Sequence, residues 1–533
     1  MPENIGRALV CLAEPAHFRL RLFLEGLLIG ALTGAVIALY HVLLEGADWL
    51  RPEVYAFLRT AGPLWTVGWF LFLWGLSFIV WRMMRLDSMV GGGGIPDIKG
   101  ILRGETRLRW ARVLVGKFVG VVLSIGAGLS LGRGGPSVEL GACVGAGVSR
   151  TAGRSNSEER FLLTAGAGAG FAAIFNAPLA SLVFSFEELA KNFSQQVLMG
   201  VLGAAIAAGF VTQEVFGVGP MFAVGPVAAV PLGEMYLLLF ALGIFSGGLG
   251  RLFNAFLLRS LAAWARLRVP DWLRVALPFL AAGTLGFFLP DILSGGNFLV
   301  NRLVLGQVMP AALFLLLIGK FLFTGVCYGS GVPGGIFLPV LVLGALSGAV
   351  FAAGAAALGF LPPDLCPTFI IFGMAGFFSG SIKAPVTGSV FIMEITGSFE
   401  HLLAVVCVAA AAVLVNDLTG GRPVYDELYE RSHRLCEGEA AKRGRHVMAE
   451  IHVGAGSRLA NRTIAAIPWP PRAHVLNVRR GSEELLPQGA LRLLAGDFLY
   501  VLTDEGDLQT LEQAAAEGSS LAQGSAERHG EEL

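Results

Sequence analysis

Residues 132–136 read Gly-Arg-Gly-Gly-Pro, and this stretch stands where an apolar membrane helix would otherwise continue. Residues 91–96 (Gly-Gly-Gly-Gly-Ile-Pro) and 334–339 (Gly-Gly-Ile-Phe-Leu-Pro) interrupt apolar regions in the same way. Proline is favoured in a first helical turn, glycine lets backbone N–H groups approach a ligand closely, and a helix N-terminus carries about half a positive charge. The three stretches together predict broken helices whose N-termini converge on an anion. For any one stretch alone, close helix packing through small residues is the simpler interpretation.

The composition places these stretches in a membrane protein. Of 533 residues, 54% are apolar and 15% are charged, whereas soluble domains carry about a quarter charged residues. Apolar segments long enough to cross a bilayer recur from about residue 22 to residue 416. The fold class expected is therefore an all-α polytopic membrane protein with tilted and broken helices.

Charge and cysteine content exclude several classes of function. The 39 basic and 39 acidic residues balance, so no basic field indicates a nucleic-acid partner. The six cysteines are scattered and form neither a CxxC pair nor a zinc-ligand cluster. No HExxH motif, Ser/His pair or carboxylate cluster stands at helical spacing in the apolar segments, so a membrane-embedded enzyme is poorly supported. We expect no metal and no cofactor.

Charge asymmetry and composition define the expected organisation. Basic residues precede the first apolar segment and follow the last one, which places both termini in the cytoplasm, with an even number of crossings of the cell (inner) membrane. Beyond residue 420 charges become dense and short alternating runs appear, at residues 447–453, 474–478 and 497–502, followed by a helical pattern at 506–515. The expected parts are a cytoplasmic N-terminal segment (1–21), a membrane domain of two repeats (22–430), a small cytoplasmic α+β domain (446–515) and a disordered tail (516–533).

An internal repeat supports duplication of the membrane domain. Leu-Gly-Ala at residues 140–142 recurs at residues 343–345, and in both places it follows one of the Gly/Pro stretches. Phe171, Ala-Pro at 177–178, Phe184 and Glu187 recur in the same order as Phe378, Ala-Pro at 384–385, Phe391 and Glu394. Duplicated halves with broken helices are typical of channels and secondary transporters, whose site lies between the repeats.

As a set, the three stretches resemble the motifs of the CLC family of chloride channels and chloride/proton antiporters, over about residues 20–430. The family's GSGIP, GREGP and GxFxP motifs match residues 92–96, 132–136 and 335–339, and residues 175–180 and 423–425 are also similar to the family's pattern. The resemblance implies two inverted-topology halves, a homodimer in the lipid membrane with one pore per subunit, and chloride or a similar small anion as the transported partner. The anion-binding residues that it implies are Gly93, Gly94, Gly134, Gly135, Ile336, Phe337 and Tyr425.

Two departures from the family's motifs shape the functional prediction. Gly93 stands where the family has a serine linked to choice among anions, so the preferred anion is open and chloride is the default. Gly134 stands where the family has its gating glutamate, which carries protons in the antiporters. Glycine cannot titrate. The sequence therefore predicts a passive chloride (anion) channel or an uncoupled anion transporter.

The alternative is a proton-coupled antiporter that uses another carboxylate. Glu188 falls on the inner proton-transfer glutamate of the family's antiporters. An intramembrane carboxylate is a functional candidate, but one proton site without the other cannot complete an exchange, so a structural or cytoplasm-facing Glu188 is favoured. Glu187, Glu394, Glu139, Lys117 and Lys383 are expected to pair within helices or at helix ends.

The soluble part resembles the C-terminal regulatory domain of TrkA-type potassium-uptake proteins over roughly residues 446–514. The matching stretches are residues 456–463, 478–481 and 494–497. The resemblance implies sensing of a still unknown ligand or a dimer contact, and a plain docking module is an equally good interpretation. No TVGYG-like filter is present, so the domain does not indicate a potassium channel.

Overall fold

The computed structural model describes residues 15–504 and residue 511, except 192, 220, 223–227, 229, 231–232, 398, 441–445, 455–456, 458, 471–472, 481–482. The chain divides into two compact units, Met1–Glu430 and Arg431–Leu533. Most of the predicted helix at 506–515, the predicted disordered tail and residues 1–14 lie outside the described residues.

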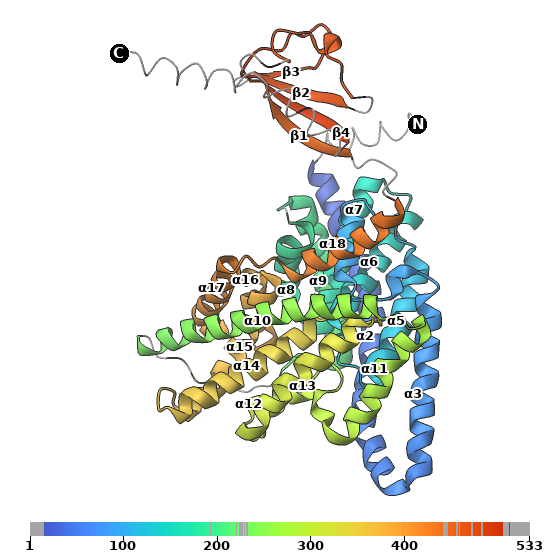
Figure 1. The fold of residues 1–533 in the computed structure, drawn as a ribbon, viewed down its shortest axis with the longest axis vertical. Coiled ribbons are helices and arrows are strands. Elements are labelled where there is room, and N and C mark those ends of the chain that lie inside the picture. The colour runs from blue at the N-terminus through green and yellow to red at the C-terminus, as the bar shows by residue number, and fades with distance from the viewer. Residues whose placement is uncertain are drawn as a thin grey trace. The chain divides into compact units, whose positions relative to one another are not determined.

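The first unit consists of helices that cross one another at many angles (Figure 1). Within the described residues, eight helices are long and apolar enough to cross a membrane. This arrangement agrees with the expected all-α polytopic fold. The helices are α2 (Pro15–Ala61), α3 (Pro63–Met84), α4 (Ile95–Leu102), α5 (Trp110–Gly126), α6 (Gly134–Thr151), α7 (Asn156–Phe175), α8 (Pro178–Phe184), α9 (Gln195–Phe216), α10 (Glu234–Arg266), α11 (Asp271–Phe288), α12 (Asn297–Val304), α13 (Pro310–Gly329), α14 (Phe337–Ala357), α15 (Cys366–Ile382), α16 (Pro385–Thr396), α17 (Leu402–Leu418) and α18 (Val424–Ala440).

The three Gly/Pro stretches become helix starts, as predicted. Gly94 precedes α4 with φ 86°, and Gly334 precedes α14 with φ 148°, conformations in which a side chain would be strained. α6 begins at Gly134 itself. The proline of each motif lies in the first turn, where its missing N–H costs nothing.

The two halves of the first unit repeat one another in structure. α4 and α12 each have eight residues, α6 packs on α7, and α14 packs on α15. The repeated glycines explain this packing, because an added Cβ at Gly141 would meet the backbone of Gly166, and one at Gly344 would meet the backbone of Gly373. Close packing is therefore the role of the repeated Leu-Gly-Ala glycines.

Two buried lysines extend the repeat and were not recognised as a pair from the sequence. The Lys117 ammonium donates to the carbonyl oxygens of Met89 (2.9 Å) and Gly91 (2.8 Å), in the loop before α4. The Lys320 ammonium donates in the same way to Ile292 (3.1 Å) and Ser294 (2.6 Å), before α12. Both lysines stand in a Gly-Lys-Phe triplet, at residues 116–118 and 319–321. That triplet is the signal that could have revealed them.

Glu187 and Glu394, the repeat-related carboxylates, each bind the helix of the other half. Glu394 accepts hydrogen bonds from the N–H groups of Leu179 (3.0 Å) and Ala180 (2.7 Å) in α8. Glu187 accepts from the N–H groups of Val386 (3.3 Å) and Thr387 (2.6 Å) in α16. Each carboxylate thus satisfies two N–H groups that have no partner within their own helix. The prediction of helix-end pairs is confirmed for these two residues.

Two long apolar stretches of the sequence, residues 160–186 and 367–396, are split in the structure. The segment at 160–186 breaks after α7, where Asn176 is left-handed, and the segment at 367–396 breaks after α15, where Lys383 is left-handed. An Ala-Pro pair follows each break, and the residue before a proline avoids the helical conformation. By contrast, α2 is continuous for 47 residues and passes through Pro52.

The second unit contains a four-stranded antiparallel sheet in the order β1-β4-β2-β3. Its core includes Ile451, Val478, Leu499 and Val501, all at most 2% exposed. The predicted strands at 447–453, 474–478 and 497–502 are present, but β3 was missed because it is three residues long and carries two glutamates. The strands are β1 (His446–His452), β2 (His474–Arg480), β3 (Glu483–Leu485) and β4 (Phe498–Asp504).

Candidate functional site

The three predicted helix N-termini meet backbone to backbone. Gly132 and Gly335 exchange hydrogen bonds, with N to O distances of 2.6 and 2.8 Å. The N–H of Gly334 donates to Gly92 (3.1 Å), and a Cβ added at Gly135 would meet the carbonyl oxygen of Gly93. The structure therefore brings together the glycines of all three motifs, because only residues without side chains allow this approach.

Four N–H groups at this junction remain available to a ligand. Within the described part of the chain, those of Gly134, Gly135, Ile336 and Phe337 donate to no backbone carbonyl outside their helices. They belong to the first turns of α6 and α14 or directly precede them, where no intrahelical acceptor exists. Such groups, with the positive end of the helix dipole, stabilise an anion.

Phe175 occupies the space beside Gly134. A Cβ built on Gly134 would lie 2.5 Å from Cζ and 2.8 Å from Cε2 of Phe175, and 3.5 Å from Cβ of Phe337. The place that a side chain at position 134 would need is therefore filled by an aromatic ring.

Phe175 belongs to a cluster of six buried phenylalanines. Its ring centroid lies 5.1 Å from that of Phe337 and 4.9 Å from those of Phe171 and Phe391. All six side chains are fully buried, so their rings close the space next to the junction. The phenylalanine cluster consists of Phe171, Phe175, Phe184, Phe337, Phe378 and Phe391. Four members are the repeat-related pairs of the sequence.

Tyr328 lies beside Gly93, the residue that the resemblance matched to a serine. A Cβ added at Gly93 would be 3.0 Å from the Tyr328 hydroxyl. Sequence reasoning missed Tyr328, which lies at the end of α13. The Tyr328 side chain places a hydroxyl next to residues 92–96, which have none of their own.

Tyr425, the predicted pore tyrosine, lies at the start of α18 and is 2% exposed. Its hydroxyl is buried and has no hydrogen-bond partner among the described residues. Tyr328 and Glu188 lie within electrostatic range of it. An unpaired buried hydroxyl costs free energy, so the Tyr425 hydroxyl is able to donate a hydrogen bond to a bound ligand.

Glu188 lies in a short π-helix, η2 (Ser185–Ala190), and is buried in an ion-pair network. Its carboxylate pairs with Lys99, whose ammonium also lies 2.8 Å from an oxygen of Asp426. Lys191 pairs with the other oxygen of Asp426. The network ties η2 and α4 to the start of α18.

Glu139 and Lys117, two further charged residues singled out from the sequence, are fully buried and form an ion pair at 2.7 Å. Lys383 pairs with Asp417. Among the described residues, no group of three or more His, Cys, Asp or Glu side chains is arranged to hold a metal ion.

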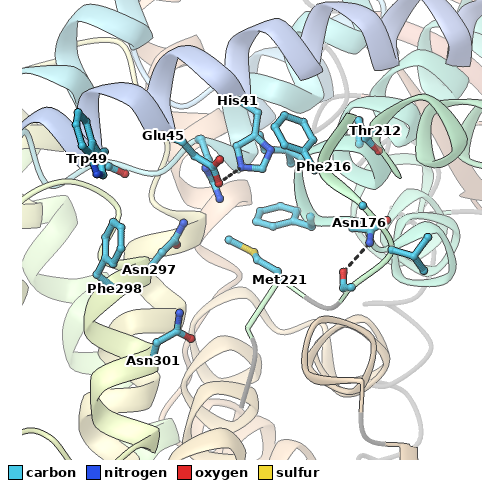
Figure 2. A pocket seen from close by; sticks show the side chains of 18 residues that line it. His41, Glu45, Trp49, Asn176, Thr212, Phe216, Met221, Asn297, Phe298 and Asn301 are labelled. Carbon is cyan, nitrogen blue, oxygen red and sulfur yellow. Dashed lines mark hydrogen bonds and ion pairs between the residues drawn. The ribbon is translucent and has the colours of Figure 1, made fainter. Parts of the chain in front are cut away.

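Two cavities approach this region, and no residue lines both of them. The first, of about 620 Å³, is called the vestibule here; Figure 2 shows His41, Glu45, Asn176, Asn297 and Asn301 around it. Arg133 and Phe175 also line it, and the ring of Phe175 lies against Gly134. The second cavity, of about 520 Å³, is lined by the four cations Lys99, Arg103, Arg160 and Lys191. Lys99 and Lys191 are paired with Glu188 and Asp426, so the two arginines supply the positive charge that would concentrate anions here.

Comparison with known protein families gives two matches along the chain. Residues 75–417 match the family described as "Voltage gated chloride channel", and residues 448–516 match the TrkA-C domain. The first match falls on the helical unit and the second on the sheet-containing unit. Both resemblances stated from the sequence are confirmed.

Relatives with curated names are exchange transporters. The H(+)/Cl(-) exchange transporter ClcA of Vibrio cholerae serotype O1 is 34% identical over 425 residues, covering 77% of this chain and 89% of that protein. The protein of the same name from Citrobacter koseri is 33% identical over 443 residues, covering 80% of this chain and 92% of that protein.

Solved structures share the fold. A slow cyanobacterial Cl⁻/H⁺ antiporter superposes with a TM-score of 0.73 at 29% identity, covering 77% of this chain and 98% of that one. A eukaryotic CLC transporter superposes with a TM-score of 0.65 at 23% identity, covering 77% of this chain and 74% of that one. The latter supports the fold alone.

Proposed function

Because this chain belongs to the voltage-gated chloride channel (CLC) family, we propose that it carries chloride, or a similar small anion, across the membrane. One observation carries the proposal. The first turns of α6 and α14 meet where Gly132 and Gly335 exchange hydrogen bonds, called the glycine junction here, and their N–H groups are unpaired. Gly93, Gly94, Gly134, Gly135, Ile336, Phe337 and Tyr425 are the residues that we assign to the anion path. N–H groups and a neutral hydroxyl hold an anion loosely enough for release.

We infer a transporter rather than an open channel. Phe175 lines the vestibule, its ring lies against Gly134, and it is packed into the buried phenylalanine cluster, so we infer that an anion passing here must wait for side chains to move. The relatives carry the names of exchange transporters, which favours the same choice. The packing argues against an open channel, and the names of the relatives favour the exchange alternative over the passive channel or uncoupled transporter that the sequence alone placed first.

Proton coupling is the version of this proposal that the relatives favour, with Glu188 as the inner proton site. Its carboxylate is buried beside Lys99 and borders the basic cavity through that lysine. The uncoupled version rests on Gly134, which bears no carboxylate and faces the Phe175 ring. Coupling therefore requires an outer proton acceptor other than residue 134.

Ion flux from proteoliposomes tests the proposal and separates its two versions. Vesicles containing the full chain are loaded with chloride, and a chloride electrode and a pH electrode record efflux together. Chloride release is expected, and its absence from a folded, inserted protein would refute the proposed function. Proton uptake at a fixed ratio to chloride indicates exchange, and none indicates uncoupled transport.

Two carboxylate variants assign the proton step. In the exchange version, Glu188→Gln abolishes proton uptake. Glu400→Gln removes an exposed carboxylate instead and serves as the matched control. Equal proton uptake in wild type and Glu188→Gln would remove Glu188 from the mechanism.

We propose that the TrkA-C unit regulates transport and is not needed for conduction. The glycine junction, Tyr425 and both cavities lie within Met1–Glu430. Deletion from residue 446 onward should leave measurable chloride flux in an inserted dimer. Loss of all flux, with insertion and dimerisation intact, would show that the unit belongs to the conduction mechanism.

A further inference from the structure

The vestibule holds a buried cation that lacks a partner. Arg133 is 4% exposed, and its Nε is buried without a hydrogen-bond partner. No carboxylate lies within ion-pair distance of its guanidinium among the residues that the structure describes. A buried, unpaired guanidinium is costly, and here it faces a cavity large enough for a hydrated anion.

Two amides of α12 add further unpaired polar atoms. The side-chain oxygens of Asn297 and Asn301 are buried and have no hydrogen-bond partner in the described part of the chain. Both residues line the vestibule (Figure 2). An amide can turn its NH₂ group toward an anion as readily as its oxygen toward a donor.

A histidine–glutamate pair lines the same vestibule as Arg133. His41 Nε2 lies 2.8 Å from Glu45 Oε1, one turn apart on α2. Both side chains point into the cavity (Figure 2). Histidine is the side chain that most readily gains a proton on mild acidification, so this pair is the part of the vestibule that can take one up.

The remaining charges around the pair are few. Asp48, also on α2, lines the vestibule but is paired with Arg51 at 2.8 Å. The lining residues from α9, namely Thr212 and Phe216, are uncharged, and α12 contributes the two amides and Phe298. Among the described residues, Arg133, Glu45 and His41 are therefore the charges not already cancelled by another neighbour.

The sum of these charges depends on one proton. With His41 neutral, the Glu45 carboxylate offsets Arg133, and the vestibule presents no net charge to an anion. With His41 protonated, the pair is internally neutral and the charge of Arg133 is uncompensated. Acidification therefore turns the vestibule into an anion site.

We propose that the vestibule binds one proton and one anion cooperatively, the proton on the His41–Glu45 pair and a small inorganic anion at Arg133. This inference rests on the proposed chloride transport and identifies where that transport responds to pH. This coupling between proton and anion is opposite in sign to that expected of a carboxylate at position 134, whose charge would compete with the anion for its site. Here the proton favours the anion instead of replacing it, and linkage requires that the anion also favours the proton.

Chloride dependence of flux at two pH values tests the inference. Flux into proteoliposomes is measured over a range of chloride concentrations, with the same pH on both sides, at pH 5.5 and 7.5. The half-saturating chloride concentration of the wild type should be lower at pH 5.5, by on the order of tenfold, because one unit of charge changes within the cavity. Equal half-saturating concentrations at the two pH values would overturn the inference.

Three variants assign the effect to the pair. His41→Gln should show, at both pH values, the high half-saturating chloride concentration that the wild type shows at pH 7.5. Glu45→Gln should show, at both pH values, the low concentration that the wild type shows at pH 5.5. Glu214→Gln, an exposed carboxylate of α9 outside the vestibule, is the matched control and should keep the pH shift. A shift that persists in His41→Gln would also overturn the inference, because another group would then carry it.

Calorimetric titration of chloride into the purified full chain provides a measurement that does not depend on transport. Affinity should be higher at pH 5.5 than at pH 7.5 in the wild type and equal at the two pH values in His41→Gln. Absence of flux with pH-dependent binding would reject the proposed function and retain the site. Flux and binding that are both independent of pH would reject the site and retain the function.

Discussion

Restoring a carboxylate at position 134 should fail unless the neighbouring ring is removed as well. A Cβ at Gly134 would lie 2.5 Å from Phe175 Cζ, and the Phe175 ring packs 4.9–5.1 Å from those of Phe171, Phe337 and Phe391, measured between centroids. Gly134→Glu must displace this ring, and overpacking of a closed core costs about 1–3 kcal/mol. We expect the variant to unfold at a lower temperature and to transport less at every pH.

The double variant Gly134→Glu/Phe175→Ala should behave differently. Removing the ring costs about 3–5 kcal/mol of stability but opens space for the carboxylate at the N-terminus of α6, where its negative charge is favoured. Lowering the pH from 7 to about 4.3, the ordinary pKa of a glutamate, raises the protonated fraction of this carboxylate by on the order of several hundredfold. Chloride flux should therefore be low at pH 7 and rise on acidification.

Proteoliposome flux at pH 7 and 4.5 compares wild type, both single variants and the double variant. We expect acidification to raise chloride flux at least about tenfold more in the double variant than in Phe175→Ala. In Gly134→Glu alone, acidification should not raise the flux. If Gly134→Glu is as stable as wild type and already shows acid-relieved block, then Phe175 does not obstruct this position and the reasoning is wrong.

Three further predictions follow from contacts described above. Tyr425→Phe should weaken chloride binding by about 0.5–1.5 kcal/mol, because one neutral hydrogen-bond donor is lost; unchanged affinity in calorimetry would place the hydroxyl outside the path. Lys117→Met leaves the Glu139 carboxylate buried without its cation, which should cost about 3–5 kcal/mol of stability in thermal unfolding; a wild-type melting temperature would contradict this pairing. In the TrkA-C unit, hydrogen bonds from Arg480 lower the pKa of Asp497 below its usual 3.8, so their stabilisation is present at neutral pH and lost as the pH falls below about 4. Urea titration with pulse proteolysis should show that acid destabilises this unit in the wild type and less so in Asp497→Asn.

The local starts of the helices could be predicted from the sequence, because they depend on residues close together in the chain. Glycine and proline at residues 92–96, 132–136 and 335–339 act on their own backbone, and each stretch does begin a helix. The same holds for the second unit, where alternation of apolar and polar residues predicted three of the described strands. The inverted-repeat fold followed from these motifs and from the resemblance that they carried.

The surroundings of the site could not be predicted in this way, because they come from distant parts of the chain. Tyr328 approaches Gly93 from a helix more than 200 residues later, and the hydropathy of α13 alone gives no reason to expect it there. Phe175 was quoted only as part of a motif, and nothing local indicates that its ring covers Gly134. The vestibule combines α2, α7, α9 and α12 with Arg133, which directly precedes α6, so its charges become neighbours only after folding.

The exchange of helix caps between the halves has a consequence for biosynthesis. When residues 178–184 leave the ribosome, the N–H groups of Leu179 and Ala180 still lack the carboxylate of Glu394. At 5–20 residues per second, that partner follows only after roughly 10 to 40 seconds. An uncapped helix start within a bilayer costs several kcal/mol per unsatisfied group, so the first half must wait in a partly assembled state that holds these groups near water or lipid headgroups. The two similar halves therefore depend on each other, and neither half expressed alone should reach its native form.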